Sequence, residues 1–369
     1  MSTIAPTPDA PDAPELADQD LPPELLDSDG PSKGLRQTTL LSKDARLAGR
    51  PKLCSDCGLC DSELKQRMAN TCVFVRNRVD EIERRLFGRN RGDGDELRFG
   101  VFESMHAARM REPPPNAQWS GMVTTLAVRL LERGEVDAVI TAAAMPGTRF
   151  APRPVLARTP DQVRASAGNK PCLSPNLALL DQVRDAGITR LAFIGTGCQV
   201  HMLRAAEQEL GLERLDVIGI PCSDNVTYPD LTFFLEQLSR SPHTIVHFEF
   251  MQDYILIMRL EDGSEERLNL FVFQMDRLEG IFPSACLSCF DYANTLADIT
   301  IGYMGAALGW QWGLVRNARG RALFELMRPK LKLAELGSGG DRSRGKPTFN
   351  HMLDKTTAKP PKRVRRLVA

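Results

Sequence analysis

Four cysteines near the amino terminus constrain this chain more than any other feature of its sequence. They are spaced as C-x2-C-x2-C with a fourth further along, at Cys54, Cys57, Cys60 and Cys72. Three thiolates in one tight loop, in which Gly58 eases the turn, can converge on one face of an iron–sulfur cubane while the distant cysteine binds its fourth corner. Structural zinc is the competing interpretation, but zinc usually takes two separated pairs of thiols. The spacing therefore favours an iron–sulfur cluster.

A second group of cysteines is scattered along the chain. Cys198 and Cys222 each follow a predicted parallel strand, at the edge where an open α/β sheet assembles its sites. The pair Cys286 and Cys289 would supply two more ligands from a loop. An isolated cysteine is more often a buried apolar thiol, and this is our interpretation of Cys172, which has no companion. The count of the remaining thiols predicts a second cluster.

Charge and hydropathy exclude several classes of protein. The chain has 47 basic and 47 acidic residues among 369, so it lacks the cationic excess of a protein that mainly grips nucleic acid. No apolar stretch approaches the roughly 18 residues of a membrane-spanning helix, and the start of the chain has no signal-peptide pattern. We therefore expect a soluble, cytoplasmic protein without a nucleic-acid partner. In that reducing compartment, clustered thiols bind metal more often than they form disulfides.

The two ends of the chain differ from its centre. Residues 1–50 are rich in Pro, Ala and Asp and have few large apolar side chains, which predicts a disordered acidic tail. Residues 331–369 include a Gly/Ser/Arg-rich stretch and a run of Lys and Arg, which predicts a basic flexible tail. This basic tail is either a solvated segment or a contact with an acidic partner or an anionic membrane surface.

Between the tails, helical and strand patterns alternate. Helices are predicted over 122–134, 175–187 and 199–210, and the strands that follow them over 137–141, 190–194 and 215–220. From Thr244 the pattern becomes β-rich and antiparallel. The fold class is therefore α/β, with a mostly parallel central sheet, flanking helices and a β-rich C-terminal part. We expect an iron–sulfur segment over 51–95, an α/β cofactor domain over 96–240 and a β-rich domain with the second cluster over 241–330.

The sequence has no G-x-G-x-x-G after a strand and no Walker loop. Two turns of small residues do open predicted helices, one at Ser120 and Gly121 and the other at Ser174 and Asn176. Free backbone N–H groups at a helix start can hold a pyrophosphate, although Ser and Gly are also ordinary caps. Arg153, held between two prolines, is either a ligand for a phosphate or carboxylate or a surface side chain.

In combination, eight short motifs resemble the beta subunit family of coenzyme F420 hydrogenase and dehydrogenase. They are Cys54–Cys60, Gln118–Gly121, Ala151–Ala157, Leu173–Asn176, Gly197–Gln199, Phe250–Tyr254, Cys286–Tyr292 and Gly302–Gly305. The resemblance runs in order over roughly 53–326 and is greatest to the chlorophyll-pathway branch of the family, while both tails lie outside it. It also implies a ferredoxin-like form for the first iron–sulfur segment.

The resemblance implies a flavoenzyme with FAD and two [4Fe–4S] clusters, fed by reduced ferredoxin. Within the branch, the short C-terminal region and the motif Gly309–Trp312 are similar to enzymes that reduce the 8-vinyl group of 3,8-divinyl (proto)chlorophyllide a to ethyl. Reduction of the hydroxymethyl group of 7-hydroxymethyl chlorophyll a is the first alternative. A deazaflavin oxidoreductase subunit that needs a hydrogenase or formate dehydrogenase partner is the second, and a non-catalytic electron-transfer or zinc-scaffold protein is the third.

The resemblance and the motifs together assign roles to particular residues. Residues expected to bind the flavin are Ser120, Gly121, Thr124, Thr125, Thr141, Arg153, Ser174, Asn176, Gly195, Gly197 and Gln199. The proton donor is sought among Asp253, Asp291 and Tyr254, each of which is otherwise a capping or core polar group. The first cluster would accept electrons from ferredoxin and the second would pass them to the flavin. Trp119 and Trp310 either line a macrocycle pocket or pack in the core, and a homo-oligomer is possible.

Overall fold

The computed structural model describes residues 54–64, 72–74, 76–146, 148, 150–251, 254–269, 281–304, 306 and 308–334. Its strands are β1 (Ser104–Met110), β2 (Ala138–Ala144), β3 (Pro152–Ala157), β4 (Arg190–Gly195), β5 (Arg214–Gly219), β6 (Ile245–Phe250), β7 (Ile255–Leu260), β8 (Glu265–Asn269), β9 (Ile299–Gly302), β10 (Gln311–Val315) and β11 (Leu331–Ala334). Its α-helices are α3 (Val79–Phe87), α4 (Glu96–Phe99), α5 (Met122–Glu132), α6 (Pro160–Ala165), α7 (Leu180–Asp185), α8 (Gly197–Ala206), α9 (Tyr228–Leu238), α10 (Ser284–Leu287) and α11 (Ala318–Met327). Short 3-10 helices are η4 (Leu59–Asp61), η5 (Asn176–Leu179), η6 (Glu207–Glu209), η7 (Pro242–Thr244) and η9 (Arg328–Lys330).

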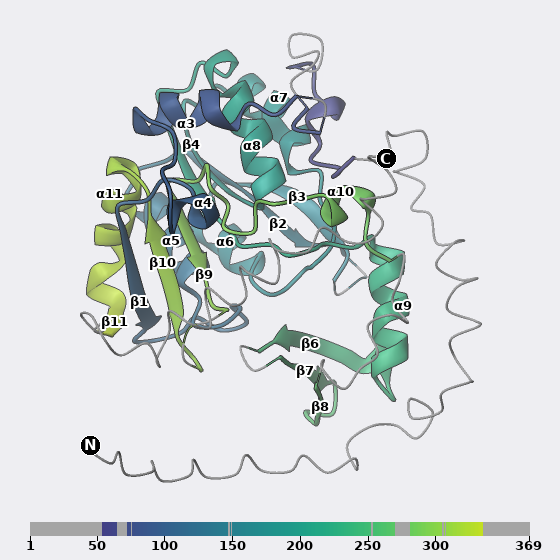
Figure 1. Cartoon of the computed structure of the whole chain (residues 1–369). Helices are drawn as coiled ribbons and strands as arrows, with labels where there is room; N and C mark the ends of the chain where they lie inside the picture. The colour runs from purple at the N-terminus through teal and green to yellow at the C-terminus, as the bar shows by residue number, and fades with distance from the viewer. Residues whose placement is uncertain are drawn as a thin grey trace, which may run out of the picture.

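The main sheet has eight strands in the order β11-β1-β10-β9-β5-β4-β2-β3 (Figure 1). The neighbours β9, β5, β4 and β2 run parallel, while β3, β10 and β11 run antiparallel to the strands beside them. The predicted parallel strands therefore form the centre of the sheet, and the antiparallel strands beside them make the whole sheet mixed. The physical reason is the connections, because β2 to β3 and β9 to β10 are joined by short loops, whereas a parallel pair needs a long crossover.

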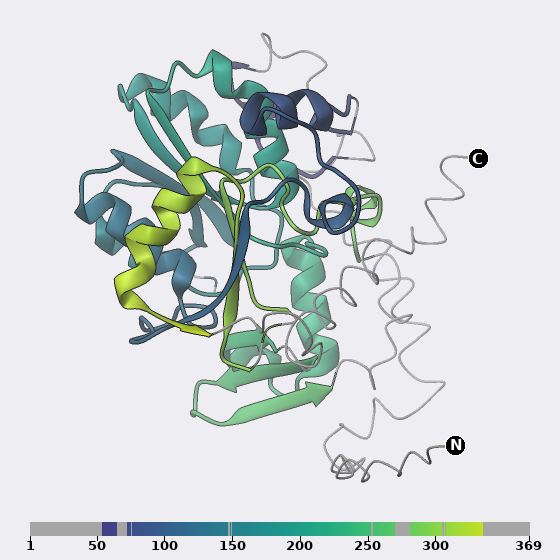
Figure 2. The same cartoon turned by 60° about the vertical axis from the view of Figure 1, so that its left-hand side comes forward.

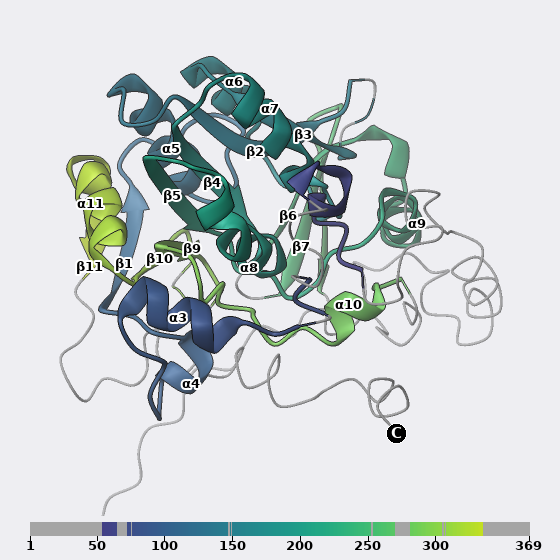
Figure 3. The same cartoon turned by 90° about the horizontal axis from the view of Figure 1, so that it is seen from above.

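Helices cover both faces of this sheet (Figures 1 and 3). On one face α3, α7 and α8 pack with Leu191 and Phe193 of β4 in one apolar cluster. On the other face α5, α6 and α11 pack with Ala192 and Ile194 of the same strand. Alternate residues of β4 therefore point to opposite faces, and those after Arg190 are all buried, which explains why the strand is apolar from Leu191 onward.

The predicted alternation of helices and strands is confirmed over residues 122–220. The helical predictions correspond to α5, to η5 with α7, and to α8 with η6, while the strands correspond to β2, β4 and β5. Gly134 and Gly187, each with a φ of 63°, lie just past α5 and α7. Only glycine adopts this left-handed backbone at little cost, so these two residues mark the helix ends in the sequence.

A second sheet, of β6, β7 and β8, is antiparallel throughout, as the pattern from Thr244 predicts. It packs against α9 in its own apolar cluster, which includes Phe248, Met258 and Leu235. Figures 1 and 2 show this small sheet apart from the main one, below its β1 and β10 ends. The strands β9 and β10, which follow in the sequence, return to the main sheet between β5 and β1.

The start of the described chain is built from turns and helices. Among the described residues of 54–99, η4, α3 and α4 form but no strand does. A ferredoxin-like form for this segment therefore stays a prediction. Within the described ranges, no helix has the length and apolar character needed to cross a membrane.

Candidate functional site

Most predicted site residues lie along one edge of the main sheet, where the parallel strands β2, β4, β5 and β9 end. Cys198 is the second residue of α8, directly after β4, and Cys222 follows β5. The amide of Cys222 donates to the carbonyl of Tyr292 at 3.2 Å, which ties the end of β5 to the segment after α10. Open α/β sheets form ligand sites at this edge because successive strands release the chain there. Both cysteines lie where the sequence places them, just past a strand end.

Cys286 and Cys289 join Cys198 and Cys222 around one cavity. Cys286 lies in α10, and the amide of Cys289 donates to the carbonyl of Cys286 at 3.1 Å, so both thiols belong to one turn. Asp291 also lines this cavity, which we call the cysteine cavity. Four thiols from three separate parts of the sequence therefore share one site in the fold.

The first cysteine loop is docked on the turn that begins η5. Gly58 has a φ of 93°, and a Cβ atom there would lie 2.4 Å from the carbonyl oxygen of Pro175. The amide of Leu177 donates to the carbonyl of Cys57 at 2.9 Å. Within the loop, the amide of Asp56 donates to the sulfur of Cys54 at 3.3 Å. Glycine is required at position 58 because any side chain would separate the loop from η5.

The two groups of cysteines adjoin. The thiol of Cys57 interacts electrostatically with those of Cys198, Cys60 and Cys72. Ser55, next to the first cysteine of the loop, lines the cysteine cavity. The start of α8 is therefore the point at which the amino-terminal loop meets the second group.

The chemistry of the thiols fits an iron–sulfur group. None of the nine cysteines, all of which lie in the described ranges, forms a disulfide. Burial is the largest cause that raises the pKa of the Cys57 and Cys222 thiols, and it raises the pKa of Cys286 and Cys289 to about 12. Buried thiols need a neighbouring positive charge to ionise, and metal ions supply it. Among the described residues, no three His, Cys, Asp or Glu side chains are close enough to hold a single metal ion. A cubane binds each thiolate at a different iron, so it requires a wider spacing than one ion does.

At the start of α5, where flavin contacts are predicted, the polar groups already form hydrogen bonds within the protein. The hydroxyl of Ser120 and the amide of Met122 both donate to the side-chain oxygen of Gln311. A Cβ atom on Gly121 would lie 2.5 Å from Pro114. Thr124 and Thr125 are half-buried on α5. Gln311, at the start of β10, thus fixes the start of α5, a contact that sequence analysis does not identify.

The second predicted turn supports α8 and the first cysteine loop. The side chain of Gln199 donates to the carbonyl of Ser174 at 2.7 Å, and Ser174 donates to Asn176 at 2.7 Å. A Cβ atom on Gly197 would lie 2.6 Å from the carboxylate of Asp291. These small residues therefore allow the turn, α8 and the segment after α10 to pack around the cysteine cavity.

The remaining predicted flavin residues are spread along three strands. Gly195 ends β4, and its carbonyl accepts from the side chain of Asn294 at 2.8 Å. Thr141 lies in β2, buried at 9% exposure, and Arg153 is exposed on β3. Arg153 and Thr141 are not in the lining of the cysteine cavity.

The proton-donor candidates have different surroundings. Asp253 lies outside the described residues. Tyr254 has a φ of 64°, and burial raises its pKa. Asp291 accepts from the amide of Thr295 at 2.8 Å and lines the cysteine cavity. Of Tyr254 and Asp291, the latter is the one held beside the thiols.

A larger cavity, of about 580 Å³, lies at the same edge of the main sheet, between β1, β11 and β6. Its lining includes three cations, Arg109, Arg111 and Lys332, together with Glu249 and Trp119, and we call it the basic cavity. Sequence analysis does not identify it, because β1 and β11 were not predicted. The signal that could have found it is the alternation of Arg109 and Arg111, which places both on one face of a strand.

An aromatic pair lies between the two cavities. The rings of Trp119 and Tyr303 stack with centroids 3.8 Å apart and planes at 18°. Burial raises the pKa of Tyr303, and its phenol interacts electrostatically with both Glu249 and Cys222. Tyr303 thus interacts with a residue of the basic cavity, Glu249, and with a residue of the cysteine cavity, Cys222.

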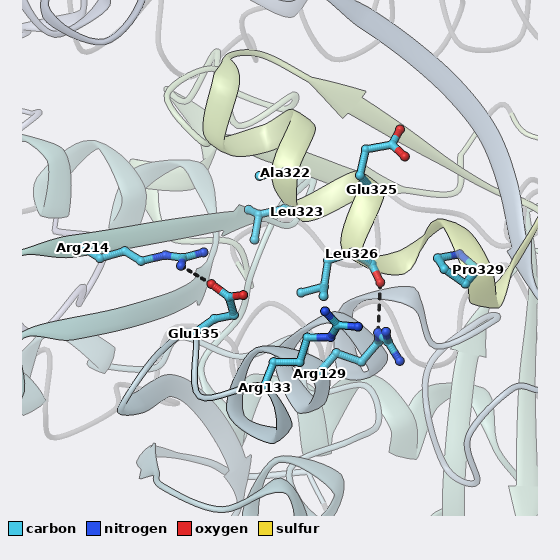
Figure 4. Close-up of a pocket in the computed structure, with 9 residues that line it drawn as sticks. All are labelled: Arg129, Arg133, Glu135, Arg214, Ala322, Leu323, Glu325, Leu326 and Pro329. Carbon is cyan, nitrogen blue, oxygen red and sulfur yellow. Dashed lines mark hydrogen bonds and ion pairs between the residues drawn. The ribbon is translucent and has the colours of Figure 1, made fainter.

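A further cavity, of about 310 Å³, opens at the opposite end of the sheet strands, beside α5 and α11 (Figure 4). Two of its arginines are engaged, because Arg214 pairs with Glu135 and Arg129 donates to the carbonyl of Leu326 at 3.0 Å. It lies where β5 begins, away from the edge that carries the thiols. It is therefore not part of the candidate site.

Two family models match most of the described chain. Residues 105–181 match the amino-terminal model of the family described as "Coenzyme F420 hydrogenase/dehydrogenase, beta subunit", and residues 188–337 match the carboxy-terminal model of the same family. An uncharacterized protein of Nostoc sp. is 45% identical over 293 residues, which cover 79% of this chain and 74% of that protein.

A named relative is the chloroplastic 7-hydroxymethyl chlorophyll a reductase of Oryza sativa, 44% identical over 301 residues. The match covers 78% of this chain but 64% of the rice enzyme, just under two thirds of its length. The beta subunit of the coenzyme F420 hydrogenase of Methanothermobacter thermautotrophicus is 27% identical over 62% of this chain and 82% of that protein.

A solved structure has the same fold. A chain of the F420-reducing [NiFe] hydrogenase complex from Methanosarcina barkeri aligns with a TM-score of 0.65 and 21% identity, over 74% of this chain and 95% of that chain. At this identity the likeness concerns the fold alone. It supports the mixed α/β arrangement with a large sheet and flanking helices.

Proposed function

Because the chain belongs to the coenzyme F420 hydrogenase/dehydrogenase beta subunit family, we propose that it is a ferredoxin-dependent iron–sulfur flavoenzyme of the chlorophyll pathway. Its substrate is 3,8-divinyl (proto)chlorophyllide a, whose 8-vinyl group it reduces to ethyl. The vinyl group takes up two electrons and two protons, so two reduced ferredoxins are oxidised for each pigment. The observation that carries the proposal is the convergence of Cys198, Cys222, Cys286 and Cys289 on one cavity beside the first cysteine loop.

The proposal assigns the eight cysteines to two cubanes. Cys198, Cys222, Cys286 and Cys289 hold the inner one, around the cysteine cavity. The amino-terminal set, Cys54, Cys57, Cys60 and Cys72, holds the other, and the exposed Cys60 is on the side open to a docking ferredoxin. When bound, the clusters supply single-electron transfer and FAD supplies two-electron chemistry.

The chain's own residues orient these groups and keep protons available. Tyr303 is a protonated phenol at neutral pH, because burial raises its pKa, and it stacks on Trp119 beside the basic cavity. The carboxylate of Asp291 is fixed by the hydrogen bond that it accepts from the amide of Thr295 and by its close packing on Gly197. Asp253, Tyr254 and Asp291 remain the proposed proton donors, and the residues predicted from the sequence to hold FAD keep that proposed role.

One observation favours a second candidate reaction. The rice relative is named for 7-hydroxymethyl chlorophyll a, and its identity of 44% nearly equals that of the Nostoc protein. Reduction of a hydroxymethyl to a methyl group also takes two electrons and two protons, with water as the leaving group. The same cysteines would serve either reaction.

Anaerobic turnover tests the proposal. The protein, purified without oxygen, is supplied with reduced ferredoxin and with divinyl chlorophyllide a or 7-hydroxymethyl chlorophyll a in separate reactions, and the products are identified by mass. The proposal expects an ethyl product from the first pigment. A product from the second pigment alone supports the alternative, and turnover only with reduced coenzyme F420 indicates a deazaflavin oxidoreductase. A protein with neither iron nor flavin would be a scaffold.

Cysteine variants test the ligand assignment. Cys286→Ser and Cys57→Ser are each expected to lower iron per chain by about half, because each removes one ligand of one cubane. Cys172→Ser is the matched control, since Cys172 is buried and lies outside both groups. Equal iron in all three variants contradicts the assignment.

A further inference from the structure

The charges of the basic cavity are unbalanced. Arg109, Arg111 and Lys332 line it, and Glu249 is the one carboxylate among the described lining residues. That carboxylate accepts from the amide of Trp119 at 2.6 Å and is thus already engaged. No ion pair with another described residue involves any of the three cations, whereas most arginines elsewhere in the described chain have one.

The pairing of β1 with β11 makes this arrangement costly. Arg109 and Lys332 are directly opposite each other across the two antiparallel strands. Like charges in such a pair repel, and the pair destabilises a sheet unless something between them carries the opposite charge. Arg111 lies two residues further along β1's direction and is anchored by its amide, which donates to the carbonyl of Lys330 at 2.9 Å. Three cations thus line one cavity, with Glu249 as the one carboxylate among its described lining residues.

Apart from Glu249 and Ser120, the rest of the described lining is apolar. Trp119 presents a ring that is stacked on Tyr303, and Met251 lines the side formed by β6. The guanidinium of Arg109 lies 5.1 Å from the centre of the Trp310 ring. A flat apolar ligand with an anionic group at one edge matches these two kinds of surface.

A phosphate is a poorer match than a carboxylate on an apolar ligand. The polar groups at the start of α5 that would bind a phosphate, the Ser120 hydroxyl and the Met122 amide, are both directed to Gln311. Arg109 and Lys332 are side chains on the strands β1 and β11, and Arg111 directly follows β1, so the cations come from strands and not from a helix start.

We propose that the basic cavity binds the pigment through a free carboxylate, held by Arg109, Arg111 and Lys332. The inference rests on the proposed function and specifies its substrate class: a free-acid pigment is selected over the same pigment as an ester. Esterification removes the charge and leaves the cations without a partner. The selection concerns the acid side chain and not the group that is reduced. It favours divinyl chlorophyllide a, a free acid, over 7-hydroxymethyl chlorophyll a, whose acid side chain is esterified.

The test compares a free-acid divinyl pigment with its methyl ester, which removes the charge while adding little bulk. Charge-assisted hydrogen bonds contribute about 1.5–3 kcal/mol, so the ester is expected to have a KM about 10- to 100-fold higher. The value of kcat should change little, because the carboxylate is remote from the reacting group and its binding is uniform. Equal KM values for acid and ester would overturn the proposal.

Variants locate the effect. Arg111→Gln and Lys332→Gln are expected to raise the KM for the acid about 10-fold and leave that for the ester unchanged, and Lys332→Arg should restore most of the acid preference. Arg158→Gln is the matched control, an exposed arginine next to β3 at the other edge of the sheet. The Arg111→Gln and Lys332→Gln variants could instead lose FAD and, once FAD is added back, still prefer the acid over the ester. That result would assign the cations to a flavin phosphate and overturn the proposal.

Equilibrium binding separates this inference from the proposed function. Pigment titrations of the iron- and flavin-loaded protein, without ferredoxin, give dissociation constants for acid and ester. If neither pigment is reduced, the proposed function fails, and tighter binding of the acid still supports the carboxylate site. If the pigments are reduced but acid and ester bind equally, the proposed function stands and this inference fails.

Discussion

At the scale of single residues, the absence of a side chain at position 58 sets the distance between two cysteine-bearing parts. The left-handed backbone of Gly58 turns the first loop, and its bare Cα lets the loop lie on the carbonyl of Pro175. Two residues after Pro175, the amide of Leu177 donates a hydrogen bond to the carbonyl of Cys57 and holds the loop in place. One residue therefore serves both the local turn and the long-range contact.

Substitution of this glycine separates the two effects. Gly58→Ala adds backbone strain and a clash with main-chain atoms, and we expect it to lower the free energy of unfolding by about 2–4 kcal/mol. Gly88→Ala is the control, because Gly88 has a φ of 73° but nothing within 4 Å of the added Cβ. Gly88→Ala should lower the free energy of unfolding by the backbone strain alone, about 1 kcal/mol. Urea unfolding of both variants measures the difference, and equal losses would show that the contact with Pro175 does not matter.

A buried histidine predicts acid sensitivity. Burial, aided by the charge of Arg78, lowers the pKa of His201 on α8 to about 4. In the unfolded chain the same group titrates near 6.5, so the unfolded state binds more protons between these values. Stability should therefore fall as pH drops from about 6.5 to 4, by up to about 3 kcal/mol from this group.

Unfolding measured across this pH range checks the prediction. His201→Met should flatten the slope because it removes the titrating group, while His243→Gln, at an exposed position, should keep it. Identical slopes in His201→Met and the parent protein would show that other groups cause the acid sensitivity.

At the scale of elements, a buried ion pair joins α8 to the sheet. Arg204 and Asp298 have side chains that are 0% and 1% exposed and pair at 2.8 Å. Asp298 also accepts from the amide of Val217 in β5 at 2.8 Å, and Arg204 donates to the carbonyl of Leu296 at 3.0 Å. The helix that carries Cys198, the strand before Cys222 and the segment after Cys289 are thus held by one network.

Removal of one partner should be far more costly than removal of both. Asp298→Ala leaves the buried guanidinium of Arg204 with Glu207 as its remaining carboxylate and removes the acceptor of the Val217 amide, and it is expected to cost about 3–5 kcal/mol of unfolding free energy. The double variant Arg204→Met with Asp298→Ala should recover part of that loss. An exposed pair, Arg328 with Glu325, supplies the control Glu325→Ala, expected to cost less than about 1 kcal/mol. Denaturant unfolding of the three variants tests this order.

In the main sheet, the strands that the sequence predicts are those whose residues are buried on both faces. Val139 and Ile140 in β2 and Val217 and Ile218 in β5 form apolar runs that any strand pattern detects. The strands β9 and β10 are short, and β10 contains Gly313, so their pattern is weak and their place in the sheet depends on long-range pairing. Local pattern therefore defines the centre of the sheet but not its β1, β10 and β11 side.

The same distinction applies to the candidate site. Cys198 and Cys222 could be placed from the sequence because parallel strands end at one edge. The stacking of Trp119 on Tyr303, and the meeting of Arg109 with Lys332, join segments that nothing local relates. The basic cavity could therefore be seen only in the fold.

At the scale of the whole molecule, the two sheets of the described chain differ in how much of their surface is covered by helices. The centre of the main sheet is covered on both faces by helices. The three strands of the small sheet pack on one apolar cluster with α9, and β8 is half exposed. Parts of a protein with fewer buried contacts unfold locally at a lower free energy than unfolding of the whole molecule requires.

Native-state hydrogen exchange should resolve this difference. Amides of β4 and β5 are expected to exchange only through global unfolding, whereas those of β7 and β8 exchange through a local opening several kcal/mol lower. Denaturant dependence gives the surface exposed in each opening. A single opening free energy for both sheets would show that they unfold together.

The two prolines of β3 have a consequence for self-association. Pro152 and Pro154 are two residues apart on the last strand of the main sheet, so neither offers an N–H group and both lack it on the same side. A strand of a neighbouring molecule cannot continue the sheet there, because two of the backbone N–H donors that it would pair with are missing. If this protein forms oligomers, they are built by docking of helices or loops and not by joining sheets across this border.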